Sequence, residues 1–240
     1  MHYVIGDIHN EAKKLDNILE QIQLTSDDEV IVLGDLFDRG NEPDPVDVYL
    51  MITALQGRFI WIRGNHDQWL ADYIKKYFSL AEKERKKLFS YTYNSFDLIK
   101  QRMTEVDMLN LADTILKLPL QTELDIGGKK YLFAHAMTSN PFKREINDYY
   151  MMGNWALDLF FIEGIEGYIS LCGHTPTGTL LMEKPGRYLE KDKNSIWVNQ
   201  KENVYLLDCG CGFASGKLAC LCLETGERFY SKKIIFQNSE

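Results

Sequence analysis

The sequence repeats one pattern five times: a short apolar segment, typical of a β-strand, is followed at once by side chains that can bind a metal. The segments and the residues that follow them are His2–Ile5 before Asp7 and His9, Glu29–Leu33 before Asp35, Arg58–Ile62 before Asn65 and His66, Tyr131–Ala134 before His135, and Tyr168–Cys172 before His174. Open α/β sheets place their sites just beyond the carboxyl ends of their strands. The pattern therefore predicts an α/β fold whose strand ends gather these polar side chains at one edge.

Helical periodicity fills the gaps between these segments, as a layered α/β fold requires. Apolar residues recur at helical spacing from Leu15 to Ile22, after Asn10 as a candidate N-cap. Two further helical regions are expected, a crossover helix and a long stretch rich in Lys, Glu and Tyr, at Val46–Leu55 and Gln68–Leu118. The long stretch exceeds what a crossover needs, so we expect a helical cap at the side of the site.

The later part of the chain is expected to be mainly β-structure. Thr122–Ile126 and Lys129–Phe133 predict a hairpin around a Gly-Gly turn. Further strands are expected at Ser195–Asn199, Val204–Asp208, Lys217–Leu223 and Glu227–Ser231. We therefore predict two sheets packed face to face, the first βαβ-wound and the second largely antiparallel. The fold class is an α/β two-sheet sandwich flanked by helices, in four layers (α/β/β/α), with residues 1–240 as one domain and a helical insertion around 68–118.

Six of the polar residues form a mixed oxygen and nitrogen ligand set: Asp7, His9, Asp35, Asn65, His135 and His174. A single Gly-Asp after a strand is usually only a turn, and a single core histidine is more often a structural residue. The joint pattern, however, suits two divalent metal ions with open positions for water and substrate. Carboxylate with imidazole favours Mn²⁺, Fe or Zn²⁺ over Ca²⁺, which prefers oxygen ligands alone. Such a pair, held ~3.5–4 Å apart, activates water against a phosphate ester.

Three neighbours of these ligands suit the remaining chemistry of phosphate-ester hydrolysis. His66 follows a predicted ligand and is a candidate general acid for the leaving oxygen. Asp38 is a candidate to orient His66 by accepting its other ring N–H. Arg39 is a candidate to grip phosphate oxygens with its planar guanidinium.

The order of these motifs resembles the calcineurin-like metallophosphoesterases: GD-x-H, then GD-x-x-DRG, then GNHD, then two separated histidines. The Asp38-Arg39-Gly40 tail is similar to the phosphoprotein phosphatase branch, whose small members include bacterial and phage serine/threonine phosphatases and symmetrical dinucleoside tetraphosphatases. The resemblance implies one metal at Asp7, His9 and Asp35. It implies that Asp35 bridges to a second metal held by Asn65, His135 and His174. It also implies His66 as proton donor paired with Asp38, and Arg39 and Asn65 as phosphate contacts.

The sequence departs from the family pattern at two places. Asn10 stands where the family commonly has Gly after the first histidine. A second phosphate-binding Arg, usual between the last two histidines, is absent from the Tyr150–Asn154 segment. Arg144 from another direction, or Asn154 with a weaker contact, are the candidate substitutes.

Composition narrows the function classes. The net charge of −8 argues against a nucleic-acid scaffold, and no apolar run is long enough to span a bilayer. The five cysteines, an odd number crowded toward the C-terminus, do not form a disulfide framework and, with no export signal evident, favour a reducing cytoplasm. Two CxC pairs, at Cys209 and Cys220, allow a zinc site, but packing as small buried hydrophobes is favoured.

Two further segments carry local expectations. Glu82–Lys87 is expected to be a solvated helix face, and the rings from Tyr149 to Phe161 are expected to lie mostly in the core.

We therefore expect a metal-dependent phosphatase that hydrolyses phosphomonoesters by attack of water activated at a dinuclear centre. Phosphoserine or phosphothreonine in proteins is the first substrate expectation. The alternative is a hydrolase of dinucleoside polyphosphates, because the metal centre acts on the phosphoryl group and the leaving-group pocket decides. A catalytically inactive scaffold is least favoured, because all six ligands and His66 are present.

Overall fold

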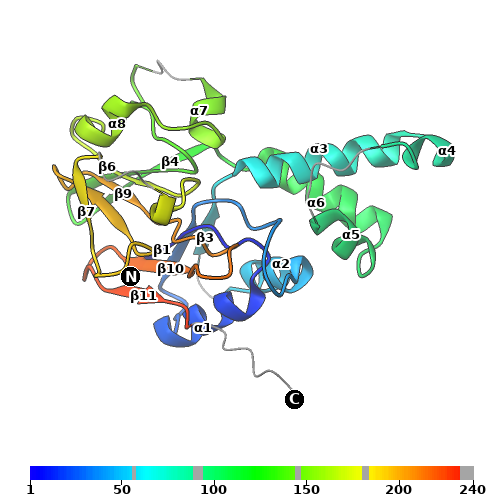
Figure 1. Cartoon of the computed structure of the whole chain (residues 1–240), viewed down its shortest axis with the longest axis horizontal. Coiled ribbons are helices and arrows are strands. Elements are labelled where there is room, and N and C mark those ends of the chain that lie inside the picture. The colour runs from blue at the N-terminus through cyan, green and yellow to red at the C-terminus, as the bar shows by residue number, and fades with distance from the viewer. Residues whose placement is uncertain (56–57, 89–93, 144–146, 180–183, 233–240) are drawn as a thin grey trace.

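Two mixed β-sheets form the centre of the molecule (Figure 1). The computed structural model describes residues 1–55, 58–88, 94–143, 147–179 and 184–232. In the first sheet the strand order is β11-β10-β1-β2-β3, and in the second it is β4-β5-β6-β9-β8-β7. The strands of the first sheet are β1 (His2–Ile5), β2 (Glu29–Val32), β3 (Arg58–Trp61), β10 (Ala219–Cys222) and β11 (Arg228–Tyr230). Those of the second are β4 (Gln121–Ile126), β5 (Lys129–Ala134), β6 (Ile169–Cys172), β7 (Gly186–Tyr188), β8 (Trp197–Asn199) and β9 (Val204–Leu206).

The middle of the first sheet is buried on both faces, and all residues of β2 and β10 are buried, which explains their largely apolar sequences. β1, β2 and β3 are parallel, as the βαβ prediction required, and β10 pairs antiparallel with β1. Successive side chains of a strand point to opposite faces. Val4 and Ile31 accordingly pack between the two sheets, whereas Ile5 and Val32 pack under the helices on the outer face.

The second sheet differs from the prediction in two respects. β5, β6 and β9 run parallel to one another, so antiparallel pairing is confined to β4 and to β7 and β8. The predicted strands near 217–223 and 227–231 exist as β10 and β11, but they extend the first sheet instead of the second. β7 was not predicted, because its three residues, Gly-Arg-Tyr, contain no apolar run.

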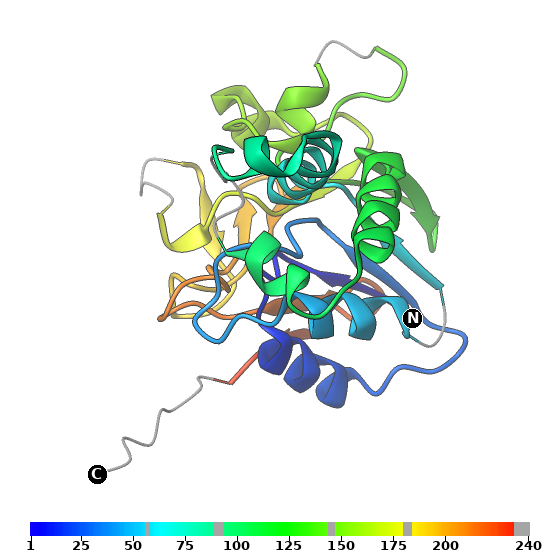
Figure 2. The ribbon, with the colours of Figure 1, turned by 90° about the vertical axis from the view of Figure 1, so that its right-hand side faces the viewer.

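Helices cover the outer face of each sheet. α1 (Ala12–Ile22) and α2 (Pro45–Thr53) lie side by side against the first sheet (Figure 2). α8 (Asp158–Glu163) packs on the second sheet through Phe160 and Phe161, near the short α7 (Asp148–Met152) and a 3-10 turn at Thr177–Thr179. The four-layer α/β/β/α sandwich is therefore confirmed.

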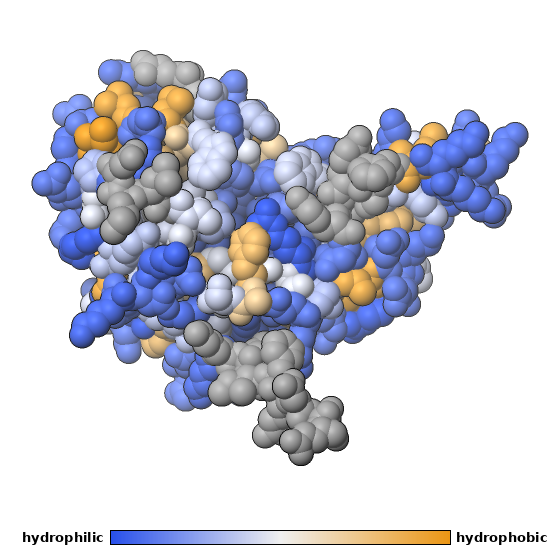
Figure 3. All heavy atoms as spheres, in the orientation of Figure 1, coloured by the Kyte–Doolittle hydropathy of each residue, from blue (hydrophilic) through white to orange (hydrophobic). Residues whose placement is uncertain are grey.

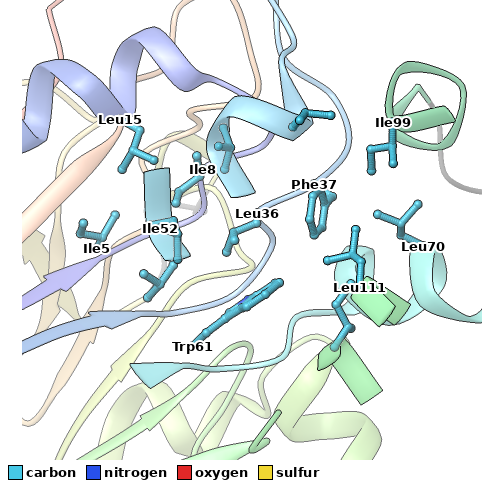
Figure 4. Close-up of a cluster of buried hydrophobic side chains, with 14 of the residues drawn as sticks. Ile5, Ile8, Leu15, Leu36, Phe37, Ile52, Trp61, Leu70, Ile99 and Leu111 are labelled. Carbon is cyan, nitrogen blue, oxygen red and sulfur yellow. The ribbon is translucent and has the colours of Figure 1, made fainter. Parts of the chain in front are cut away.

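The helical stretch after β3 forms an arm beside the sandwich (Figure 1). It consists of α3 (Asn65–Ser79), α4 (Glu82–Arg85), α5 (Ser95–Lys100) and α6 (Glu105–Lys117), and α3 packs along α6. α4 buries none of its residues, as expected for a solvated charged helix. Figure 4 shows how the arm joins the sandwich: Phe37 lies among Leu36, Leu70 and Ile99, above Trp61. The core thus fixes the backbone immediately before Asp38 and Arg39.

Several local predictions are corrected or decided by the packing. The N-cap of α1 is Glu11, and Asn10 makes different contacts, described below. Cys209 packs between the sheets while Cys211 and Cys220 pack on the helical face, so these thiols do not converge on a zinc ion. Tyr149 in α7 and Trp155 in the segment between α7 and α8 are exposed instead of core, whereas Phe160 and Phe161 are buried as expected. Among the described residues, no helix is long and apolar enough to cross a membrane.

Candidate metal centre and catalytic groups

The polar residues that follow β1, β2, β3, β5 and β6 meet at one edge of the sandwich. Parallel strands end at the same edge, so each delivers its first polar side chain to one place. Asp7, His9, Asp35 and Asn65 come from the first sheet, and His135 and His174 come from the second. All six are buried except His174, which is half-buried.

Two groups of ligand-type atoms form there, and they share one carboxylate. The first group is Asp7, His9 and Asp35, with His9 Nε2 at 4.0 Å from an oxygen of each carboxylate. The second group is Asp35, His135 and His174, with His135 Nε2 3.2 Å from Asp35 Oδ2. Within the described residues these are the groups of three or more Asp, Glu, His or Cys side chains that approach closely enough to hold an ion. Asp35 is therefore the carboxylate common to both groups, as expected of the predicted bridging ligand.

Asn65 adds an amide oxygen to the second group. Its Oδ1 lies 3.2 Å from His135 Nε2 and 3.0 Å from His174 Nδ1. His135 Nδ1 is hydrogen bonded to the carbonyl oxygen of Leu33 at 2.7 Å, and His9 Nδ1 to that of Phe37 at 3.1 Å. A backbone carbonyl at Nδ1 directs the Nε2 lone pair into the site, which is the usual support of a metal-binding histidine. The six side chains thus fit a pair of divalent ions by donor type and by orientation.

The electrostatics of the site call for added positive charge. Burial raises the pKa of Asp7 well above its usual range, and the charge of Asp208 raises it further. Asp208 is itself buried, which together with the charge of Asp35 raises its pKa to about 6, and its Oδ2 finds no hydrogen-bond donor among the described residues. Clustered carboxylates of this kind are stabilised by a nearby cation.

The histidines divide into two protonation states. Burial lowers the pKa of His9 and of His174 to about 3, so both are neutral and able to ligate a metal at neutral pH. Burial also disfavours a charged His135, but the charges of Asp35 and Asp7 outweigh it and raise the pKa of His135 to about 10. Burial alone would raise the pKa of Asp35, yet His135 and His66 hold it well below its usual range. A metal ion held by Asp35 and His135 would therefore take the place of a proton.

His66 and Asp38 form a buried pair beside the ligands. His66 Nδ1 lies 3.0 Å from Asp38 Oδ2, and the His66 ring meets the His9 ring edge to face at 5.2 Å. The backbone N–H of His66 donates to Asp35 Oδ1 at 2.9 Å, so the pair is tied to the bridging carboxylate. Arg39 follows Asp38, is half-buried, and places its guanidinium 5.1 Å from the centre of the Phe213 ring. The structure thus gathers all three predicted catalytic residues at the ligand groups.

Asp67 holds two of the ligand turns together. It is the last residue of the GNHD motif, and no role was predicted for it from the sequence. Its Oδ2 accepts the backbone N–H groups of Asp35 and Gly64, both at 3.0 Å, and the indole N–H of Trp61 at 3.2 Å. Its Oδ1 accepts the N–H of Leu36 at 3.0 Å. Four buried donors on one carboxylate fix the turn after β2 against the turn after β3.

Asn10 and the start of α5 support Asp38 and Arg39, and sequence reasoning missed this contact. Ser95 Oγ accepts the Asp38 N–H at 2.7 Å and donates to Asn10 Oδ1 at 3.1 Å. Asn94 Nδ2 donates to the Arg39 carbonyl at 2.9 Å. Asn10 itself has φ 62°, in the left-handed region that asparagine tolerates better than most residues. The asparagine therefore keeps the turn of a glycine and adds hydrogen bonds to the arm.

The site backbone is unusually rich in left-handed residues. The described non-glycine residues with positive φ include His9, Asn10, Asp35, Asp38, Arg39 and His174. Close approach accompanies these turns: a Cβ on Gly64 would collide with the Asp35 carboxylate, and one on Gly173 with that of Asp7. The chain is thus bent sharply wherever a ligand leaves its strand.

The second phosphate-binding arginine of the family pattern remains without a described equivalent. Arg144 lies outside the described residues. Asn154 follows Gly153, which packs against Asn65, but its Oδ1 accepts the N–H of Trp155 at 2.9 Å. Among the described residues, Arg39 is therefore the arginine that was predicted from the sequence to contact the phosphate.

A two-sheet α/β sandwich with paired carboxylate and histidine groups at its strand ends defines a dinuclear metallohydrolase class. Comparison places the chain within it: a model of the calcineurin-like phosphoesterases matches residues 3–207. The chain belongs to the calcineurin-like phosphoesterase family, whose members hydrolyse phosphoesters with a dinuclear metal centre. The resemblance predicted from the motifs is thereby confirmed.

Individual relatives span more than one activity. The chain is 29% identical to an uncharacterised protein of Methanocaldococcus jannaschii, over 80% of this chain and 72% of that protein. It is 38% identical to a symmetrical bis(5'-nucleosyl)-tetraphosphatase of Erwinia tasmaniensis, but over only 27% of this chain and 23% of that protein. A serine/threonine phosphatase from Saccharomyces cerevisiae shares the fold with a TM-score of 0.56 and 15% identity, over 99% of this chain and 81% of that chain.

Proposed function

We propose that the chain is a divalent-metal-dependent phosphatase that hydrolyses phosphomonoesters. The observation that supports this most directly is the sharing of Asp35 by two ligand groups, with the His66–Asp38 pair alongside. Asp7, His9 and Asp35 would hold one ion, and Asp35, Asn65, His135 and His174 the other. The two ions, most favourably Mn²⁺ with Fe or Zn²⁺ as alternatives, would supply activation of water and neutralisation of phosphate charge.

The chain's own residues supply the remaining steps. Arg39 and Asn65 bind the phosphate oxygens and set the orientation of the phosphate group. The bond between phosphorus and the leaving oxygen breaks as the bond to the attacking water oxygen forms. His66, oriented by Asp38 at Nδ1, gives the proton of Nε2 to the leaving oxygen, and the proton that the attacking water loses is released to solvent, from which His66 is reprotonated.

Two substrate classes follow from different observations. The Asp38-Arg39-Gly40 motif favours phosphoserine or phosphothreonine in proteins, which is the first candidate. The likeness to the Erwinia tetraphosphatase favours a dinucleoside polyphosphate as the second. The five cysteines are all free and buried, which supports a protein of the reducing cytoplasm.

Metal removal tests the proposal. Exhaustive chelation is expected to abolish hydrolysis of p-nitrophenyl phosphate, and Mn²⁺ is expected to restore it better than Ca²⁺, because the ligand set includes three imidazoles. Turnover of a phosphoserine peptide and of diadenosine tetraphosphate, measured with the restored enzyme, decides between the substrate classes. Full activity in protein shown by elemental analysis to be metal-free would refute the site assignment.

A further inference from the structure

A strip of ring side chains, interrupted by the backbone of Gly212, lies at the candidate centre. Trp69 lies in α3, one helical turn after His66, and the two rings meet edge to face with centres 4.7 Å apart. The His66 ring meets that of His9 at 5.2 Å. On the other side of His9, the backbone of Gly212 approaches so closely that a Cβ there would lie 2.9 Å from the His9 Cβ. Phe213 follows, beneath the Arg39 guanidinium.

Trp69 is the member of this strip that reaches solvent beyond the proton donor. It is 40% exposed, whereas Trp61 and Trp197 are each 3% exposed. Residues three apart lie on the same face of a helix, so Trp69 is directed to the same side as His66. The molecule is hollowed between the arm that begins with α3 and the end of the sandwich that carries α7 and α8 (Figure 3). An exposed indole in contact with a catalytic group is placed to touch whatever the site binds.

We propose that Trp69 determines specificity by stacking on a planar ring carried by the leaving group. This inference rests on the proposed function, because it takes Arg39 as the phosphate contact and His66 as the donor to the leaving oxygen. From phosphate to leaving oxygen, the path passes His66, and the next large side chain in contact with His66 is Trp69. A serine side chain is too short to cover the Trp69 indole, whereas a nucleoside or an aralkyl group carries a ring that can reach it.

Among phosphomonoesters, the preferred substrates are therefore those whose alcohol carries a planar ring close to the bridging oxygen, ahead of phosphoserine. In the hydrolysis, water supplies the oxygen of the new phosphorus–oxygen bond, and the ring-bearing alcohol departs with the proton of His66. Two sources share this chemistry: a nucleoside 5'-phosphate and an aralkyl or aryl phosphate. Substrate pairs that differ only in the ring distinguish them.

Phe213 has a different role in the same strip. Its ring is 46% exposed and holds the Arg39 guanidinium by a cation–π contact. Because Arg39 acts on the phosphate, which every substrate shares, Phe213→Ala is expected to lower kcat/KM by the same factor for all substrates. This makes Phe213→Ala the matched comparison for Trp69→Ala.

The first experiment compares kcat/KM within two substrate pairs in the presence of Mn²⁺. Adenosine 5'-monophosphate is paired with ribose 5-phosphate, and benzyl phosphate with cyclohexylmethyl phosphate, so that the leaving oxygens are similar and only the planar ring changes. Wild-type protein is expected to prefer the ring-bearing member by on the order of tenfold in at least one pair, the scale of aromatic stacking. Trp69→Ala is expected to reduce that preference to about twofold or less, with Trp69→Phe between. A preference in the first pair only assigns a nucleoside, and one in both pairs assigns any planar ring.

Phe213→Ala is expected to lower kcat/KM for both members of each pair and to keep their ratio. A ratio that Trp69→Ala leaves unchanged, or a wild-type ratio near one in both pairs, overturns the inference while the phosphatase proposal stands. Absence of metal-dependent turnover for all four esters and for p-nitrophenyl phosphate would instead count against the proposed function.

The second experiment detects stacking without turnover. Adenosine added to metal-free protein is expected to quench tryptophan fluorescence in the wild type. Trp155→Phe, which removes an exposed indole of the α7–α8 segment, is expected to keep the quenching, and Trp69→Phe to lose most of it. Quenching that survives in Trp69→Phe, or none in the wild type, contradicts the stacking role.

Discussion

At the scale of single residues, the proposed site assigns metal binding and proton donation to different side chains. The six proposed ligands and the His66–Asp38 pair touch through the His66 N–H to Asp35 and the His9–His66 ring contact, yet His66 and Asp38 are absent from both candidate ligand groups. Removing the proton donor should therefore leave the ligands in place. Comparing the rate loss on substrates with good and poor leaving groups then shows whether proton donation was lost.

We expect His66→Asn to keep the metal content of the wild type but to lose about 10²–10⁴-fold in kcat on phosphoserine, the scale of general acid catalysis. p-Nitrophenyl phosphate has an acidic leaving group that needs little proton donation, so its loss should be smaller. Asp38→Asn should show the same dependence more mildly, because it only misorients His66. Rates across a series of leaving-group pKa values, with metal measured in parallel, check this. Equal losses on good and poor leaving groups would remove His66 from the acid role, and loss of metal would make it a ligand.

At the scale of elements, the short α7 supports the site although it supplies no ligand. Gly153 ends this helix with φ −163°, outside the left-handed range, so the constraint considered at this position is the space around it. A Cβ at Gly153 would lie 2.6 Å from the Asn65 Cβ. Metal held by Asn65 would therefore depend on the packing of the end of α7 against the start of α3.

We expect Gly153→Ala to displace Asn65 and to lower metal occupancy and kcat together, by about tenfold or more, the scale seen when groups that orient ligands are removed. Tyr149→Ala is the control, because this side chain of the same helix is 57% exposed. Metal content by elemental analysis and phosphatase rate measure the outcome. Wild-type occupancy and rate in Gly153→Ala would mean that Asn65 has room to move and that α7 is not part of the support.

The comparison of sequence with structure is also clearest at the scale of elements. β1, β2 and β3 were predictable because each has an apolar run and a polar residue immediately after it. Their ligands needed only the rule that parallel strands end at one edge. The sheet joined by β10 and β11 was not predictable, since pairing with β1 is a contact across more than 200 residues of chain that no local pattern encodes. The support of Asp38 by Ser95 was missed for the same reason, and α7 is too short to show helical periodicity.

At the scale of the whole molecule, the candidate second metal group joins the two sheets. Asp35 follows β2 of the first sheet, while His135 and His174 follow β5 and β6 of the second. An ion held by these residues would bridge the two halves of the sandwich. Separating the sheets would then require release of the metal.

We expect saturating Mn²⁺ to raise the melting temperature of metal-free protein by roughly 5–10 °C. Binding at about 100 times Kd adds about 2.7 kcal/mol to the free energy of unfolding, and each kcal/mol shifts Tm by about 2–4 °C at this chain length. Asp35→Asn should lose most of the shift because it weakens both groups. Asp113→Asn, which removes an exposed carboxylate paired with Lys75 on the arm, should keep it. Thermal unfolding with and without Mn²⁺ measures the effect, and an equal shift in both variants would place the stabilising ion elsewhere.

The left-handed backbone of the site has a consequence for how this protein can change. A non-glycine residue in that conformation costs up to about 1–2 kcal/mol relative to ordinary backbone, least for asparagine and aspartate, and six such residues lie in the turns at the site. At these positions a higher free energy of unfolding and a higher hydrolysis rate therefore require different residues. Selection for heat tolerance alone should favour glycine at Asp38 or Arg39 and yield a more stable but inactive protein. Selection for hydrolysis should keep the strained residues.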